Sequence, residues 1–163
     1  MNLKGALVSI SKKPLEGITV LEFSQFLSGP AAGLRLSDLG ANVIKIEPPM
    51  GEPWRHASPS VPPGESRLFI ALNRGKKSIV LDLKSRKGKA AFFKLLEKSD
   101  IVMTSIRPAA MERLGIGFKA CKEINPSLIY VALVGFGQSG PYAKRPAYDD
   151  IIQGVSGMAA MQG

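Results

Sequence analysis

The chain has little of several residue types, and each scarcity narrows what the protein can be. Cys121 is the single cysteine among 163 residues, which excludes an internal disulfide and suits a reducing compartment, so we expect a cytoplasmic protein. No cysteine–histidine motif surrounds it, and a small apolar residue on a helix is expected there rather than a nucleophile. His56 is the single histidine and is assigned no role. Zinc-ligand spacing does not occur, and we expect no metal.

Long apolar runs are also lacking. One of the longest, residues 128–134, is far too short to cross a membrane, so no membrane partner is expected. Acidic residues are few, with 13 Asp and Glu against 22 Lys and Arg, and the net charge of +9 favours anionic partners. Because the sequence has no RNA-binding aromatic signature or helix-turn-helix pattern, we expect no nucleic acid. A solvated basic face without a partner is the alternative explanation of the charge.

The composition, 45% hydrophobic and 21% charged residues, is that of an ordinary globular protein. We predict that residues 1–13 form a basic leader, which lacks the cleavage pattern of a secretory signal. One domain is expected over residues 14–163. Short apolar runs rich in β-branched residues predict strands over residues 18–23, 43–47, 79–83, 101–104 and 128–134. Apolar residues at helical spacing predict helices over residues 31–39, 85–98, 109–114, 118–124 and 148–161. The alternation indicates a Rossmann-like α/β fold, with a mostly parallel sheet and helices on both faces.

Two segments stand out between the predicted strands and helices. Residues 48–63 are rich in proline and show little periodicity, which predicts a loop that is either functional or disordered. Ligands of open α/β sheets bind at the carboxyl ends of the strands. There, residues 24–33 (SQFLSGPAAG) form a turn whose small residues would let a ligand approach a helix N-terminus. The turn is not a dinucleotide fingerprint, since GxGxxG is absent, and an ordinary strand–helix turn is the alternative.

Six motifs follow one another along the chain. They are PLEGITVLEFSQFLSGPAAG, LSDLGANVIKIEPP, LNRGKKSIVLDLK, RPAAMERLGIG, INPSLIYVALVGFGQSGPY and RPAYDDIIQGVSGM. Through them residues 14–163 resemble the class III CoA-transferases. The resemblance implies the N-terminal part of that fold and an enzyme that moves CoA between an acyl-CoA thioester and a carboxylic acid through an aspartyl intermediate. CoA or acyl-CoA would be a substrate, with no permanently bound cofactor, and its phosphates match the excess of positive charge.

The resemblance also implies which residues contact CoA. The first turn would contribute Gln25, Phe26 and Ser28, the third strand Leu81 and Lys84, and the segment after the fourth strand Ser105 and Arg113. Each group has an ordinary alternative. The turn could be a plain connection, the basic residues after Lys84 a solvated helix start, and Arg113 a helix C-terminal cation that complements the helix dipole.

Tyr148 and Asp149 are the predicted neighbours of the acyl site. The racemase branch of the family has histidine at the position of Tyr148, and tyrosine is a poor base at neutral pH, so the transferase branch is favoured. No catalytic residue is predicted within the chain, because the family's nucleophilic aspartate would lie beyond Gly163. We therefore expect a fragment that cannot form the family's interlocked homodimer. A racemase-branch fragment and a non-catalytic CoA-binding or scaffolding domain are the alternatives.

Overall fold

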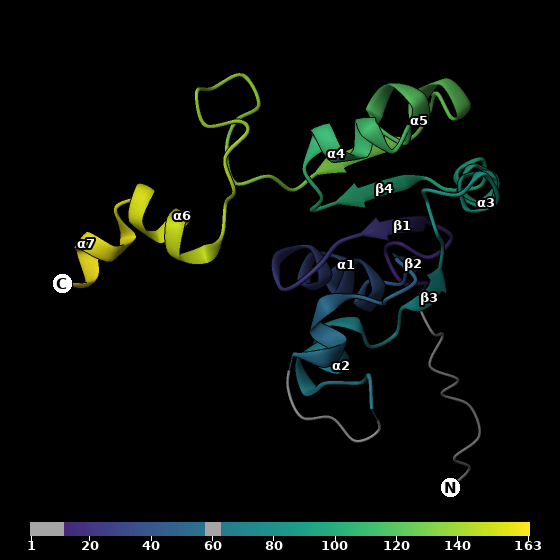
Figure 1. Ribbon diagram of the computed structural model, residues 1–163. Helices are drawn as coiled ribbons and strands as arrows, with labels where there is room; N and C mark the ends of the chain where they lie inside the picture. Colours follow the sequence, from purple (N-terminus) through teal and green to yellow (C-terminus); the bar gives the residue numbers. More distant parts are fainter. Residues whose placement is uncertain (1–11, 58–62) are drawn as a thin grey trace, which may run out of the picture.

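The computed structural model describes residues 12–57 and 63–163, and its centre is one parallel sheet of five strands (Figure 1). Most of the predicted leader, residues 1–11, lies outside the described residues. The strands are β1 (Thr19–Phe23), β2 (Asn42–Glu47), β3 (Lys77–Val80), β4 (Ile101–Thr104) and β5 (Ile129–Ala132). The predicted α/β class and parallel sheet are confirmed.

The strand order is β3-β2-β1-β4-β5, so β1 is the central strand. Val20 of β1 is in register with Val43 of β2 on one side and Ile101 of β4 on the other. The chain first moves outward from β1 through β2 to β3 and then crosses back to place β4 on the opposite side. Such a reversal opens a crevice at the carboxyl ends of the two strands beside it, which is where α/β proteins bind ligands.

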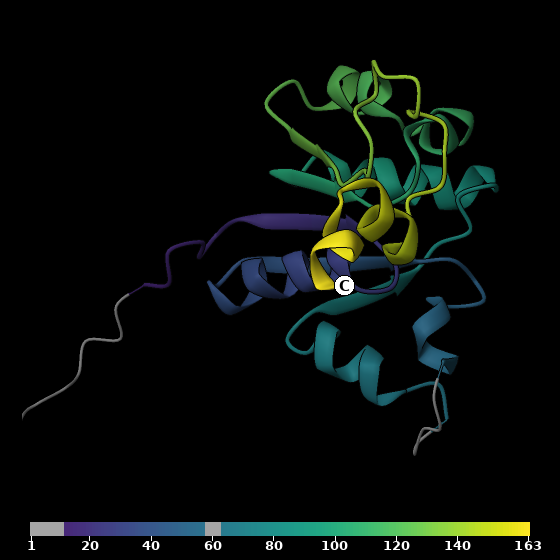
Figure 2. The ribbon, with the colours of Figure 1, turned by 90° about the vertical axis from the view of Figure 1, so that its left-hand side faces the viewer.

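Helices cover both faces of the sheet (Figures 1 and 2). On one face, Val20, Val43 and Met103 pack with residues of α1. On the other, Leu21 and Val102 belong to a core with residues of α3, α4 and α5. The helices are α1 (Ser28–Asp38), α2 (Arg67–Asn73), α3 (Arg86–Leu96), α4 (Pro108–Arg113), α5 (Phe118–Ile124), α6 (Asp149–Val155) and α7 (Met158–Gln162), with a 3-10 helix η1 (Pro53–His56).

Cys121 lies in α5, fully buried within the larger core. Its Sγ donates to the carbonyl of Ile116 at 3.3 Å. Burial raises the pKa of this thiol to about 11, with the nearby Glu112 carboxylate adding to the effect. A thiol of that kind is protonated at neutral pH and packs as a small apolar residue, as the sequence predicts.

Several element bounds predicted from sequence are wrong. Helix α1 begins at Ser28 rather than at residue 31, because Gly29 and Pro30 fit its first turn, where proline needs no amide donor. Strand β3 ends at Val80 and β5 at Ala132, each earlier than predicted. Residues 81–84 leave the sheet because Asp82 closes a turn: its Oδ1 accepts from the amide of Lys84.

Two helical regions also differ from the prediction. The proline-rich stretch contains η1 where only a loop was expected, and α2 follows it without having been predicted. Ser66 caps α2 by accepting from the amide of Phe69. The helix predicted over residues 148–161 is interrupted at Gly157, whose φ of 79° belongs to the left-handed region, so α6 and α7 are separate.

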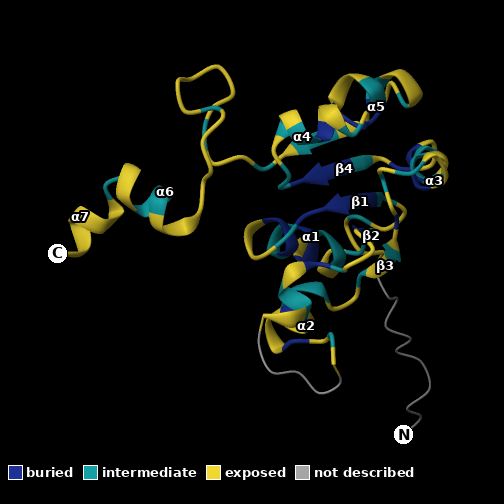
Figure 3. Cartoon of the chain, viewed as in Figure 1, coloured by how far each residue is buried: buried dark blue, intermediate teal, exposed yellow. Residues whose placement is uncertain are grey.

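The segment after β5 extends away from the sheet. Figure 1 shows α6 and α7 beside the sheet rather than against either of its faces, and Figure 3 shows them largely exposed. Tyr148, at the start of α6, is 64% exposed. None of the helices within the described residues combines the length and the apolar character needed to cross a membrane.

Candidate functional site

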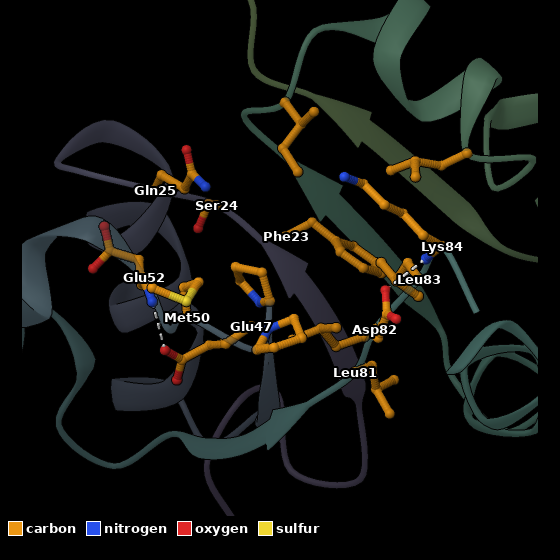
Figure 4. A pocket seen from close by; sticks show the side chains of 15 residues that line it. Phe23, Ser24, Gln25, Glu47, Met50, Glu52, Leu81, Asp82, Leu83 and Lys84 are labelled. Atoms are coloured by element: carbon orange, nitrogen blue, oxygen red, sulfur yellow. Dashed lines mark hydrogen bonds between the residues drawn. The ribbon is translucent and has the colours of Figure 1, made fainter. Parts of the chain in front are cut away.

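A cavity of about 410 Å³ opens at the carboxyl ends of β1, β2 and β3 (Figure 4). This volume is within the range of small-molecule sites. Most of the surface inside it is apolar, with several acidic groups and one lysine. Its lining residues are Phe23, Ser24, Gln25, Ile46, Glu47, Pro48, Pro49, Met50, Glu52, Leu81, Asp82, Leu83, Lys84, Ile106 and Leu114.

Three strand ends build the cavity. Phe23 is the last residue of β1 and lies in the middle of the cavity in Figure 4. Its ring packs edge-on against the ring of Phe92 in α3, with centroids 5.3 Å apart. Glu47 ends β2, and the residues that follow it form one side. Leu83 and Lys84, in the turn after β3, form the opposite side. The site therefore lies beside the point where the strand order reverses.

The β2 side of the cavity is held in place by an ion pair. Arg55 of η1 donates through Nε and Nη2 to the two carboxylate oxygens of Glu47, each at 2.7 Å. The guanidinium also lies 3.8 Å from the centroid of the Phe69 ring and donates to the carbonyl of Gly64. Two parallel charge-assisted bonds fix orientation as well as position. Arg55 thus fastens the chain that follows β2 to the end of the strand.

Glu47 makes this attachment sensitive to acid. Burial alone would raise its pKa, but hydrogen bonds from Arg55, Ser78 and the amide of Glu52 outweigh burial and lower the pKa to about 2 from 4.5. The contribution to stability is therefore complete above about pH 4.5 and is lost as the pH falls toward 2. We expect the free energy of unfolding to fall by up to about 3 kcal/mol over this window.

Urea unfolding measured at several pH values tests this expectation. Glu47→Gln should remove most of the difference between pH 5 and pH 2.5 that the wild type shows, because the amide does not titrate. Equal pH dependence in both proteins would contradict the assignment to Glu47.

A network of buried charges lies on the α1 face of the sheet, behind the cavity. Glu22 of β1 is fully buried, and its two oxygens lie 3.2 Å from Lys45 Nζ and 2.8 Å from Lys76 Nζ. Ser24 donates to Glu22 at 2.5 Å, and Lys45 donates to the carbonyl of Ser24 at 2.8 Å. Burial lowers the pKa of Lys76, and the Glu22 carboxylate opposes that shift. Because Ser24 lines the cavity, this network fixes part of its wall.

The turn between β1 and α1 forms the rim of the cavity and is held from two sides. The amide of Gln25 donates to Ser105 Oγ, beyond the end of β4, at 3.1 Å. The amide of Phe26 donates to Glu52 Oε1, beyond the end of β2, at 2.9 Å. The Phe26 ring also meets Trp54 of η1 edge-on, with centroids 6.1 Å apart.

The structure brings together some of the residues predicted from sequence. Gln25, Leu81 and Lys84 line one cavity, although they come from two different strand ends. The other predicted positions are outside its lining: Phe26 and Ser28 lie just beyond Gln25, Ser105 holds the Gln25 amide, and Arg113 precedes the lining residue Leu114. Tyr148 and Asp149 also do not line the cavity; Asp149 Oδ2 accepts from Gln153 Nε2 within α6.

Sequence reasoning missed one complete side of the cavity. Glu47 ends a strand that was predicted without a site role, and Met50 and Glu52 belong to the stretch that was predicted as a loop without assigned site residues. The rule that ligands bind at carboxyl strand ends could have found them, because this stretch directly follows β2. The described residues contain no cluster of three or more His, Cys, Asp or Glu side chains suited to a metal ion.

Comparison with known families matches the chain to one of them. The family model described as CoA-transferase family III matches residues 15–163. The chain is 43% identical over 154 residues to the acetyl-CoA:oxalate CoA-transferase of Acetobacter aceti, which covers 93% of this chain and 39% of that protein. It is 40% identical over 159 residues to the succinate–glutarate CoA-transferase of Agrobacterium fabrum, with 93% and 40% covered.

Solved structures give the same picture. The crystal structure of the hypothetical protein Rv3272 from Mycobacterium tuberculosis matches with a TM-score of 0.83 and 42% identity, covering 90% of this chain and 40% of that one. A CAIB/BAIF family protein from Brucella suis matches with a TM-score of 0.84 and 39% identity, again covering 90% and 40%. The chain therefore spans about two fifths of the length of the relatives it matches.

Proposed function

Because the chain belongs to CoA-transferase family III, we propose that its cavity binds the CoA part of an acyl-CoA. One observation carries the proposal. The resemblance to the family predicts that Gln25, Leu81 and Lys84 contact CoA, and these residues line one apolar cavity at the carboxyl ends of the strands. An apolar cavity with few polar groups suits a small organic molecule, and the excess of positive charge on the chain favours the phosphates of CoA. Lys84 and Arg113 would provide the charge, with Phe26, Ser28 and Ser105 shaping the rim.

The proposed reaction is the transfer of CoA from an acyl-CoA to a carboxylic acid. A carboxylate attacks the thioester carbonyl carbon, which forms an acyl-aspartyl anhydride and releases CoA thiolate. The thiolate then attacks the aspartyl carbonyl, which gives an aspartyl-CoA thioester and frees the donor acid. The acceptor carboxylate then attacks the aspartyl-CoA thioester, which forms a second anhydride and releases CoA thiolate again. The thiolate finally attacks the acceptor carbonyl of this anhydride, which gives the new acyl-CoA and frees the aspartate. We assign the residues of this cavity the anchoring of CoA.

The assignment of roles at the acyl end is part of the same proposal. In this proposal, Tyr148 and Asp149 lie next to the acyl group of the bound substrate. The cytoplasm is the proposed compartment, because a chain with a single buried cysteine needs no oxidising environment. A non-catalytic CoA-binding role is the second candidate, and it is favoured by the exposed position of Tyr148 away from the cavity.

Calorimetric titration of the chain with CoA tests the anchoring role. We expect Lys84→Ala and Arg113→Ala each to weaken CoA binding by about 1–3 kcal/mol, the range of a hydrogen bond to a charged group. Lys98→Ala is the matched control, because Lys98 is an exposed lysine just before β4, at the amino ends of the strands. Its affinity should equal that of the wild type. Equal affinity in all four proteins would remove the cavity rim from the site.

A further inference from the structure

Phe26 is the one residue other than glycine with a positive φ among the described residues, at 61°. A side chain in the left-handed region is strained, and such strain persists only where neighbouring groups impose it. The strained residue directly follows Gln25, which lines the cavity. Phe26 is 41% exposed, so packing of its ring alone does not fix the backbone there.

Glu52 makes a hydrogen bond to the backbone of this strained residue. Its Oε1 accepts from the amide of Phe26 at 2.9 Å, although the two residues are 26 positions apart in sequence. The Glu52 side chain is almost fully buried, at 1% exposed, and its second oxygen has no hydrogen-bond partner within the described residues. Among the described residues, the amide of Phe26 is therefore the one hydrogen-bond partner of the Glu52 side chain.

Glu52 is itself held rigidly. Its backbone amide donates to Glu47 Oε2 at 3.0 Å, and the Glu47 carboxylate also accepts two hydrogen bonds from Arg55. A continuous chain of contacts thus runs from the end of β2 to the turn after β1. Ser105 holds the same turn from the β4 side through the amide of Gln25.

From this geometry we propose that Glu52 is a positioning residue, which holds Phe26 in the left-handed conformation and thereby sets Gln25 and the rim of the cavity for CoA. The inference rests on the proposed function for its ligand. Glu52 acts through the turn, since the oxygen without a partner is shielded from solvent and the other is occupied by the Phe26 amide.

Four variants of the chain test the proposal: E52A, E52Q, E52A/F26G and E52A/F26A. We expect E52A to weaken CoA binding about tenfold. Without the bond to Glu52, the backbone strain at Phe26 is no longer offset, and the turn leaves the conformation that binds CoA. E52Q should stay within about threefold of wild type, because the amide oxygen still accepts from Phe26. Affinity is measured by calorimetry at a temperature where thermal melting shows all the proteins to be folded.

The two double variants separate positioning from general support of the fold. Both remove the Phe26 ring and its contact with Trp54, so any effect of the ring cancels between them. Glycine adopts a positive φ readily, whereas alanine does not. E52A/F26G should therefore recover most of the lost affinity relative to E52A/F26A. Equal affinities in the two double variants, or wild-type affinity in E52A, would overturn the proposal.

A second measurement does not depend on CoA. Hydrogen exchange of the Phe26 amide, followed by NMR, should be protected in the wild type and in E52Q and should lose protection in E52A. If the wild type binds no CoA, the proposed function fails, and the exchange rate alone decides the positioning role. Protection of the Phe26 amide that persists in E52A would then overturn it.

Discussion

Replacing Glu22 by alanine is expected to lower the free energy of unfolding by about 3–5 kcal/mol, the range for removing one partner of a buried ion pair. The substitution leaves Lys45 and Lys76 buried, at 1% and 2% side-chain exposure, without the carboxylate that lies between them. Two ammonium groups of like charge would then face one another in a poorly solvated space. Urea unfolding at neutral pH measures the loss.

A matched control separates this network from the general cost of losing a glutamate. Glu123 is exposed on α5 and makes no salt bridge within the described residues, so Glu123→Ala should change the stability by no more than about 0.5 kcal/mol. Removing all three charges tests the cause. Glu22→Leu combined with Lys45→Met and Lys76→Met should recover much of the loss, because no unpaired charge stays buried. A triple variant no more stable than Glu22→Ala would argue against unpaired charge as the cause.

The contacts of this buried network were difficult to predict from the sequence. Glu22 and Lys45 sit inside strands that read as apolar runs, and nothing in either run reveals that the two side chains face each other. The register of β1 and β2 determines their pairing, with Glu22 directly opposite Lys45. A charged residue inside an apolar strand is the available local signal, since such a residue is rarely buried without a partner.

The sheet itself could be predicted because its signal is local. Each strand is a short run of apolar and β-branched residues, and β4 was predicted with its observed bounds, residues 101–104. The sequence prediction placed the end of β3 at residue 83 instead of residue 80. Leu81 is apolar and buried, as a strand residue would be, but it lies in the turn that lines the cavity. Helix α2 follows a proline-rich stretch without clear periodicity, and seven residues are too few for a distinct helical pattern.

The candidate site could be predicted only in part, for a related reason. Resemblance to the family predicted Gln25, Leu81 and Lys84 as CoA contacts, through motifs that are continuous in sequence. The contact between Phe26 and Glu52 joins a turn to a proline-rich stretch, and neither segment carries a local sign of the other. Such a contact depends on the strand order, which places the carboxyl ends of β1 and β2 side by side. The sequence therefore predicted one side of the cavity and missed the other.

Gly29, in the first turn of α1, packs tightly against Ser24 of the cavity wall. A Cβ on Gly29 would lie 2.9 Å from Ser24 Oγ and still closer to Ser24 Cβ, with Ser105 Cβ at 3.5 Å. Real Cβ atoms essentially never come within 3.0 Å of another heavy atom, so one side must move. Ser24 cannot yield easily, because its hydroxyl donates to Glu22 and its carbonyl accepts from Lys45. The start of α1 would have to shift instead.

We therefore expect Gly29→Ala to lower the free energy of unfolding by about 1–3 kcal/mol, the usual cost of overpacking a tight site. CoA affinity should fall at least about tenfold, because the displaced turn carries Gln25 and Phe26 at the rim of the cavity. Gly154→Ala is the matched control. Gly154 lies in α6, where an added Cβ meets no atom within 4 Å, and alanine there should leave CoA binding unchanged and stabilise the helix by about 0.5–1 kcal/mol.

Urea unfolding and calorimetric titration of both variants decide the outcome. A Gly29→Ala protein with normal affinity and reduced stability would show that the turn accommodates the methyl group without moving the rim. Normal stability as well would show that the approach of α1 to Ser24 is not a constraint. If Gly29→Ala weakens CoA binding and Gly154→Ala does not, the first turn of α1 belongs to the CoA site. Both substitutions add the same methyl group, so the difference between them comes from its position.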